Sequence, residues 1–168
     1  MSGRIFLLGD DIDTDQLAPG QYMRGGLDML AAHCLESARP DFAGSVKPGD
    51  VIVAGKNFGM GSSREQAAEA LRHLGLAGVV AKSFAGIFYR NALNLGLPVL
   101  VADNLDGIVD GDAVALDPVK GELRLTDKKQ TVRLEPLPDN LKPMLADGGL
   151  VPHLKKRFAA ERAKEAGA

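Results

Sequence analysis

A ten-residue segment in the first half of the chain combines groups that could bind an anion and move a proton. It reads NFGMGSSREQ at residues 57–66, with two glycines, two adjacent hydroxyls and an arginine. The sequence predicts a helix from about Ser63, whose unpaired first-turn amides would attract negative charge. Gly59 and Gly61 carry no Cβ and would let the backbone approach a ligand closely. Together with Arg64, the hydroxyls suit recognition of a carboxylate on a small molecule.

The spacing of this segment excludes the two common phosphate-binding loops. A Walker loop closes with Gly-Lys-Ser/Thr, whereas Lys56 precedes the glycines here. The dinucleotide fingerprint needs a third glycine where Arg64 stands. A serine-capped helix with glycines for packing stays open as a purely structural interpretation. Arg64 favours a ligand site, because it extends the inward-facing row of the predicted helix, where an arginine is costly without an anion or water.

The acidic segment DDIDTD at residues 10–15 is the second candidate. Its aspartates have calcium-loop spacing, but the sixth position is Gln16 instead of glycine and the twelfth is Tyr22 instead of glutamate. Calcium binding is therefore not predicted. The aspartates are either caps for backbone amides in a turn, or they supply a carboxylate that orients a cationic side chain near the site. The three histidines form no spaced metal pair and are expected to pack or to lie on the surface.

The elements that would position these segments predict an α/β domain. Apolar runs and stop signals predict strands at residues 4–8, 51–54, 78–81 and 98–101, and helices near 27–35, 63–74 and 83–95. Ser83 is the expected N-cap of the last of these helices. The strand–helix alternation over residues 51–101 implies parallel strands joined by crossovers. Short alternating runs at residues 113–116, 122–126 and 131–134 predict an antiparallel meander, and the tail from residue 149 predicts a helix with a solvated charged face.

The composition limits the classes of protein that need to be considered. With 168 residues, 45% of them hydrophobic and 25% charged, the chain fits one domain over residues 1–168. The formal net charge of -2 favours neither nucleic acid nor an anionic membrane surface as a partner. Since no apolar run nears the roughly 20 residues of a membrane span and no signal peptide is evident, a cytoplasmic location is expected. Cys34 is the single cysteine, and its place on an apolar helical stripe predicts a buried thiol.

Four stretches together resemble the small subunits of the isopropylmalate isomerase and homoaconitase group, which are similar to the swivelling C-terminal domain of aconitases. They are DIDTD at residues 11–15, GKNFGMGSSRE at 55–65, AKSFA and IFYRN within 81–91, and DGG at 147–149. The resemblance implies a swivelling β/β/α three-layer fold with a mixed sheet. It also implies a separate large subunit with a 4Fe–4S cluster, since one cysteine cannot hold such a cluster on this chain.

By the same resemblance, Ser62 corresponds to the serine that takes a proton from the substrate carbon as catalytic base. Ser63 and Arg64 would bind a substrate carboxylate, and Arg24 falls where aconitases have a substrate-binding arginine. Asp15 is the carboxylate that we expect to support these groups. A helix N-terminus beside an arginine would stabilise the serine alkoxide that such a base requires. No metal ligand is expected on this chain.

The resemblance predicts the small subunit of a hydro-lyase that isomerises a 2-hydroxy dicarboxylic acid, with 3-isopropylmalate in leucine synthesis as the first choice. Homoaconitate, citramalate and dimethylmalate are alternative substrates, and a non-catalytic module that binds small carboxylates is the alternative of another class. Met60 and Gln66 depart from the pattern, because cysteine and histidine are common at these positions in related subunits. The loop that tunes substrate choice in the group corresponds to residues 22–28.

Overall fold

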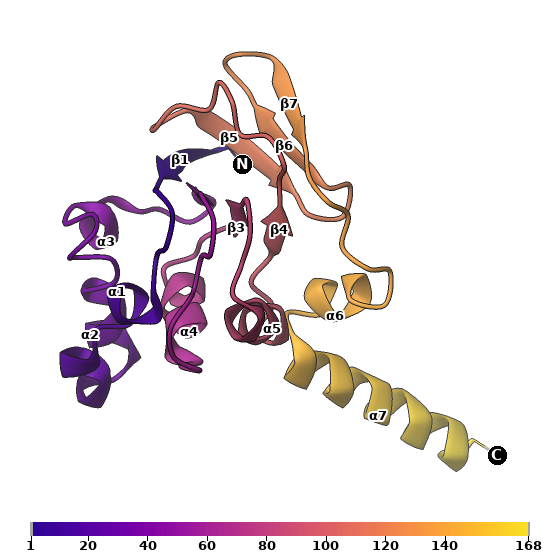
Figure 1. The fold of residues 1–168 in the computed structure, drawn as a ribbon. Coiled ribbons are helices and arrows are strands. Elements are labelled where there is room, and N and C mark those ends of the chain that lie inside the picture. Colours follow the sequence, from indigo (N-terminus) through magenta and orange to yellow (C-terminus); the bar gives the residue numbers. More distant parts are fainter. Residues whose placement is uncertain (1, 168) are drawn as a thin grey trace.

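A single mixed sheet organises the chain in the computed structural model, which describes residues 2–167 (Figure 1). Its seven strands in this range are ordered β4-β3-β2-β1-β5-β6-β7. They are β1 (Gly3–Leu7), β2 (Val51–Ala54), β3 (Gly78–Ala81), β4 (Val99–Val101), β5 (Ala113–Asp117), β6 (Glu122–Leu125) and β7 (Gln130–Arg133). Strand β1 joins two kinds of pairing, because it runs parallel to β2 on one side and antiparallel to β5 on the other.

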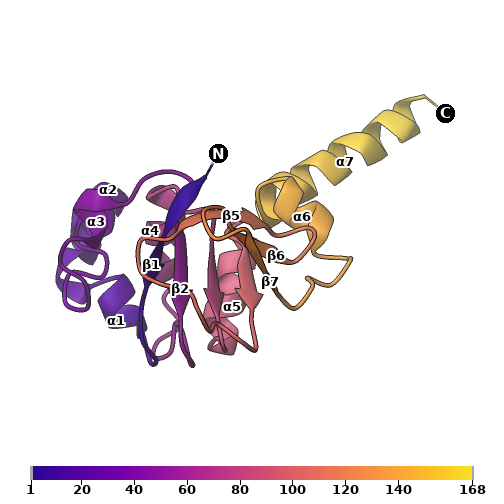
Figure 2. The same ribbon diagram turned by 90° about the horizontal axis from the view of Figure 1, so that it is seen from above.

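The parallel half consists of β1 to β4 and carries helices in its crossovers (Figure 2). Helix α4 (Gln66–His73) connects β2 to β3, and helix α5 (Gly86–Asn94) connects β3 to β4. Every residue of β2 and β3 is buried. Both faces of these strands are covered, which explains why they read as continuous apolar runs without alternation. The strand–helix alternation predicted from the sequence is confirmed.

The antiparallel half is the predicted meander of β5, β6 and β7. Burial alternates along β6, where Leu123 and Leu125 face the core and their neighbours are partly exposed. This alternation is typical of a sheet with one covered face. The mixed α/β fold expected from the sequence, with parallel units and a C-terminal meander, is therefore confirmed.

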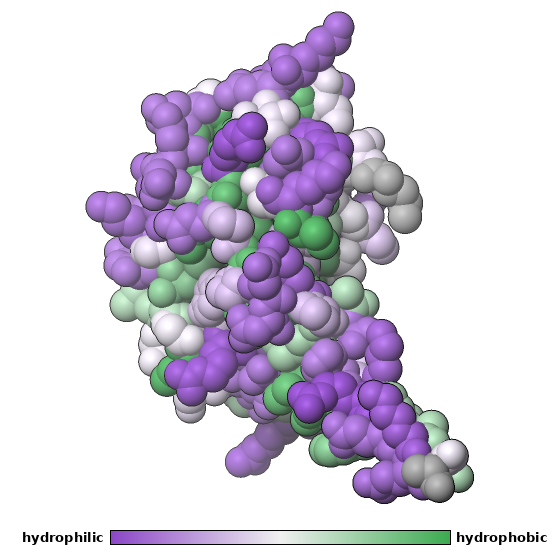
Figure 3. All heavy atoms as spheres, turned by 90° about the vertical axis from the view of Figure 1, so that its right-hand side faces the viewer, coloured by the Kyte–Doolittle hydropathy of each residue, from purple (hydrophilic) through white to green (hydrophobic). Residues whose placement is uncertain are grey.

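The remaining helices pack mainly against α4, α5 and one another. They are α1 (Thr14–Leu17), the 3₁₀ helix η1 (Gly20–Gly25), α2 (Leu27–Ala32), α3 (Phe42–Ser45), α6 (Lys142–Ala146) and α7 (Leu150–Ala166). Helix α7 extends away from the body and buries none of its residues. The face turned to the viewer in Figure 3 is mostly hydrophilic, with apolar side chains scattered over it.

Two helices begin later than the sequence predicts. Helix α4 starts at Gln66 instead of near Ser63, and α5 starts at Gly86 instead of Ser83. Neither helix has a side-chain hydrogen bond at its N-cap. Ser83 is not a cap because its hydroxyl accepts a hydrogen bond from the amide of Asn57 at 2.9 Å. The hydroxyl thus joins two loops, and the predicted cap was wrong.

Candidate active site

The glycine segment and the acidic segment lie side by side at one edge of the sheet. They leave the C-terminal ends of β2 and β1, which are neighbouring parallel strands. Four backbone N–H···O bonds of 2.7–3.1 Å join them, with the amides of Gly55, Asp11, Gly59 and Thr14 donating to the carbonyl oxygens of Gly9, Lys56, Ile12 and Met60, respectively. The topology thus brings two segments that are distant in the sequence to the edge at which open α/β sheets bind ligands.

Ser62 is exposed at the surface of this site, and its hydroxyl is held from the protein side. Its Oγ lies 2.9 Å from Oγ1 of Thr14, and its backbone amide donates to the same Thr14 oxygen at 3.0 Å. The amide of Arg64 points at Ser62 Oγ over a longer 3.4 Å. The hydroxyl therefore has a fixed position while its outer side stays open to a ligand.

Gly59 and Gly61 allow the loop to pack against the protein. Both have positive φ angles, +80° and +107°. A Cβ on Gly59 would lie 2.2 Å from Cγ of Phe88, and one on Gly61 would lie 3.1 Å from Oγ1 of Thr14. The side chains of Phe88 and Thr14 occupy the space beside the two glycines. The prediction that the missing side chains make room for a ligand was therefore wrong.

Arg64 and Asp15 form an ion pair across the two segments. The same guanidinium nitrogen also lies 3.4 Å from the carbonyl oxygen of Ala18. Arg64 precedes the first residue of α4, so its predicted place on the inward row of that helix was wrong. Its charge instead meets the Asp15 carboxylate, and 29% of its side chain remains exposed.

Ser63 and Arg24 are both exposed. The carbonyl oxygen of Ser63 accepts a hydrogen bond from the Asn91 side chain at 3.4 Å. Arg24 belongs to the 3₁₀ helix η1, which begins at Gly20, beside the Arg64 guanidinium. It makes no hydrogen bond or ion pair with Ser62 or Arg64. The structure thus brings together four of the five expected site residues and leaves Arg24 on an adjacent element.

The other aspartates of the acidic segment stabilise its own fold. Asp13 forms a capping box at the start of α1 with Gln16, whose amide donates to the Asp13 carboxylate at 2.8 Å. Asp10 accepts the amide of Lys56 at 2.7 Å. Both interpretations of the segment therefore apply, each to different aspartates. Within residues 2–167 no group of three or more His, Cys, Asp or Glu is arranged to hold a metal ion.

Two residues of this site were missed by sequence reasoning. Thr14 lies between two aspartates, and attention to carboxylates alone passed over its hydroxyl. Asn91 is in the IFYRN stretch, but its contact with the glycine segment depends on how α5 packs. Cys34 is fully buried as predicted, and burial raises the pKa of its thiol.

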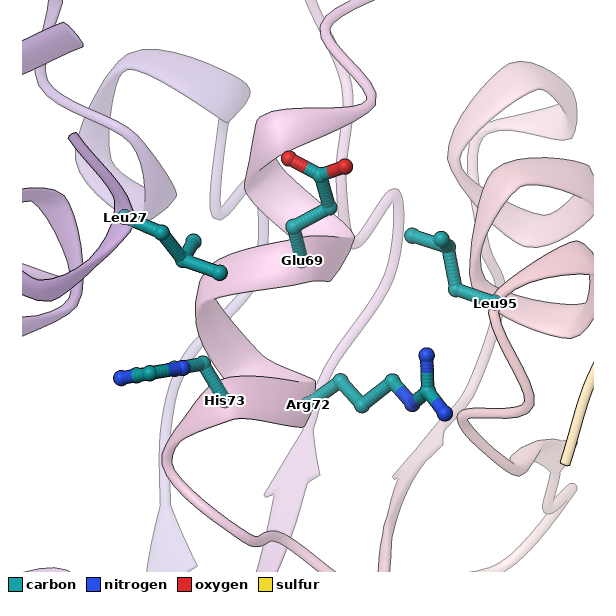
Figure 4. A pocket seen from close by; sticks show the side chains of 5 residues that line it. All are labelled: Leu27, Glu69, Arg72, His73 and Leu95. Carbon is teal, nitrogen blue, oxygen red and sulfur yellow. The ribbon is translucent and has the colours of Figure 1, made fainter.

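The pocket in Figure 4 contains none of the five candidate site residues. That pocket has a volume of about 280 Å³ and is lined by Leu27, Glu69, Arg72, His73 and Leu95. Its Arg72 and His73 belong to the last turn of α4, while the glycine segment precedes the first turn. The pocket therefore lies toward the other end of that helix. No helix in the described part of the chain has the length and apolar character that crossing a membrane requires.

Known proteins match this chain along nearly its whole length. Residues 37–104 match the aconitase C-terminal domain. The 3-isopropylmalate dehydratase small subunit 2 of Archaeoglobus fulgidus is 51% identical over 158 residues, which cover 93% of this chain and 95% of that protein. The methanogen homoaconitase small subunit of Methanothermobacter thermautotrophicus is 50% identical over 155 residues, covering 92% and 90%.

A solved structure agrees with these relatives. The crystal structure of 3-isopropylmalate dehydratase (LeuD) from Methanocaldococcus jannaschii matches with a TM-score of 0.91 at 48% identity, covering 97% of this chain and 98% of that one. The fold is thus that of the small subunits of aconitase-type hydro-lyases. The chain belongs to the family of isopropylmalate dehydratase and homoaconitase small subunits, which confirms the resemblance carried by its motifs.

Proposed function

We propose that this chain is the small subunit of a hydro-lyase that isomerises 3-isopropylmalate, and that it acts together with a large subunit. One observation supports the catalytic role. The hydroxyl of Ser62 is fixed by a hydrogen bond with Thr14 and lies on an exposed surface beside the Arg64–Asp15 pair. Relatives from Archaeoglobus fulgidus, Thermotoga maritima and Halothermothrix orenii are named 3-isopropylmalate dehydratase small subunits. Their names also imply a larger partner.

Ser62 is the proposed base that takes a proton from the substrate carbon. A serine hydroxyl ionises with difficulty, so it requires hydrogen-bond donors in a site from which water is excluded. Ser62 is exposed in this chain. A second protein surface must therefore close over it before it can act, and the large subunit is the proposed source of that surface.

Arg64 and Ser63 are proposed to bind a carboxylate of the substrate. The Arg64 guanidinium gives one nitrogen to Asp15 and keeps further N–H groups, which can form a bidentate pair with a carboxylate. Asp15 holds the planar group in one orientation, which reduces the entropy lost when the ligand binds. Arg24 is proposed to bind a second carboxylate, one that all substrates of this enzyme group share.

The iron–sulfur cluster is proposed to belong to the large subunit. Cys34 is buried, and the described residues offer no set of three or more metal-binding side chains, so this chain does not fit a 4Fe–4S cluster. In the large subunit, the cluster would supply a Lewis acid for the departing hydroxyl. This chain would then supply the base and the residues that bind the carboxylates of the substrate.

Homoaconitate is the second candidate substrate, because a relative of nearly equal identity is named a homoaconitase small subunit. A substrate panel separates the two. The chain would be co-expressed with its large subunit, reconstituted anaerobically and assayed on 3-isopropylmalate, homoaconitate, citramalate and dimethylmalate. We expect the highest kcat/KM for 3-isopropylmalate. A higher value for homoaconitate would replace the first candidate, and the absence of turnover on every acid would contradict the hydro-lyase proposal.

A further inference from the structure

Thr14 is a buried polar residue directly behind the proposed base. It is the first residue of α1 and only 2% exposed. Its Oγ1 accepts the amide proton of Ser62 at 3.0 Å and lies 2.9 Å from Ser62 Oγ. A single buried hydroxyl thus contacts both the backbone and the side chain of Ser62.

The direction of the hydrogen bond between the two hydroxyls follows from burial. A backbone N–H can only donate, so Thr14 Oγ1 accepts a hydrogen bond from the Ser62 amide. The hydroxyl proton of Thr14 still needs an acceptor of its own. A buried donor without an acceptor costs free energy, and water does not reach Thr14 to supply one. Among the described residues, Ser62 Oγ is the side-chain oxygen that lies within hydrogen-bonding distance of this hydroxyl. Thr14 therefore donates, and the proton of Ser62 is left free to point outward.

The surrounding backbone fixes Thr14 in this place. Its amide donates to the carbonyl oxygen of Met60 at 2.8 Å, and Asp13 before it caps helix α1. On the opposite side, Gly61 leaves just enough room, since a Cβ there would lie 3.1 Å from Thr14 Oγ1. Both segments of the site thus hold the two hydroxyls at hydrogen-bonding distance.

We propose that Thr14 is a positioning residue that stabilises the alkoxide of Ser62 by donating its hydroxyl proton to Oγ. This proposal rests on the function proposed above, in which Ser62 is the base. In the deprotonated form that would take the substrate proton, Ser62 Oγ carries a negative charge, and both the Thr14 hydroxyl and the Arg64 amide face it. A hydrogen bond to a charged oxygen is stronger than one to a neutral oxygen, so the contact favours the deprotonated form.

The test uses Thr14→Val and Thr14→Ser in the assembled two-subunit enzyme. Valine keeps the shape and removes the hydroxyl, so we expect kcat to fall about 10- to 100-fold with KM little changed, as for one charge-assisted hydrogen bond. The acidic limb of the kcat/KM profile should move to higher pH, because the base becomes harder to ionise. Thr14→Ser keeps the hydroxyl, so its kcat should stay within about threefold of the wild-type value. Thr131→Val, on β7 at the far end of the sheet, is the control for the same replacement and should leave activity unchanged.

A double-mutant cycle distinguishes positioning from a structural role. If Thr14 acts through Ser62 Oγ, then Thr14→Val should cost almost nothing further when Ser62 is already alanine. Normal turnover of Thr14→Val, or a loss that multiplies with that of Ser62→Ala, would overturn the proposal while leaving an active wild-type enzyme and its function intact. A wild-type complex that turns over no hydroxy acid would instead contradict the proposed function.

Discussion

Replacing Arg64 with lysine tests whether this arginine binds a carboxylate of the substrate. The change keeps the positive charge, and an ammonium group can still pair with Asp15. It removes the planar fork, so that a second, bidentate contact with a carboxylate is lost. The charge-assisted hydrogen bond at stake is worth about 1.5–3 kcal/mol. At about 1.4 kcal/mol per tenfold change, kcat/KM should fall about 10- to 100-fold, mainly through a higher KM.

The stability of the same variant should hardly change. The Asp15 side chain is 73% exposed, and exposed ion pairs contribute about 0–1 kcal/mol. For a chain of this length that corresponds to a shift in Tm of at most about 4 °C. Steady-state kinetics of the reconstituted complex and a thermal melt of the small subunit measure the two quantities. Arg72→Lys, at the other end of α4, is the control. A normal KM combined with a large loss of Tm would show that Arg64 is a structural residue and does not bind the substrate.

Three further predictions concern the fold and the isolated chain. Gly59→Ala should lower the free energy of unfolding by about 2 kcal/mol or more in urea, because its φ is +80° and its Cβ would collide with Phe88; an unchanged midpoint would contradict this packing. The Arg39 guanidinium holds the pKa of Asp110 below its ordinary value, so their pairing stabilises the fold above the ordinary carboxyl range and is lost as pH falls through the lowered pKa. Asp110→Asn should therefore lower Tm at pH 7 and approach the wild-type Tm below about pH 4; an equal loss at both pH values would argue against the pair. The isolated chain should be folded, colourless and inactive, and visible iron–sulfur absorption or turnover without a partner would contradict the two-subunit proposal.

The elements that could be predicted from the sequence are those whose pattern is local. The all-apolar runs of β2 and β3 and the alternation along β6 reflect burial on two faces and on one face, so each strand was recognisable by itself. The helix starts could not be predicted in the same way. Ser62 and Ser83 have the residue type of a cap, but their hydroxyls bond to groups in other segments.

The same distinction between local and long-range features applies to the candidate site. The glycines, hydroxyls and Arg64 could be recognised as chemistry-bearing groups from their spacing in one segment. That Asp15 pairs with Arg64 and that Thr14 lies behind Ser62 depends on β1 and β2 being parallel neighbours. Such pairings between distant segments arise from the topology of the sheet, which no pattern within either segment contains.

In the proposed mechanism, Ser62 of this chain supplies the base to an active site that the large subunit completes. This role can be tested by mixing reconstituted large subunit with either the wild-type chain or Ser62→Ala, and by measuring both complex formation and turnover of 3-isopropylmalate. Ser62 is exposed and caps no helix, so the variant should fold and bind the large subunit as the wild type does. Its turnover should fall about 10²- to 10⁴-fold, the usual loss on removing a general base. Near-normal turnover by the Ser62→Ala complex would show that Ser62 is not the base.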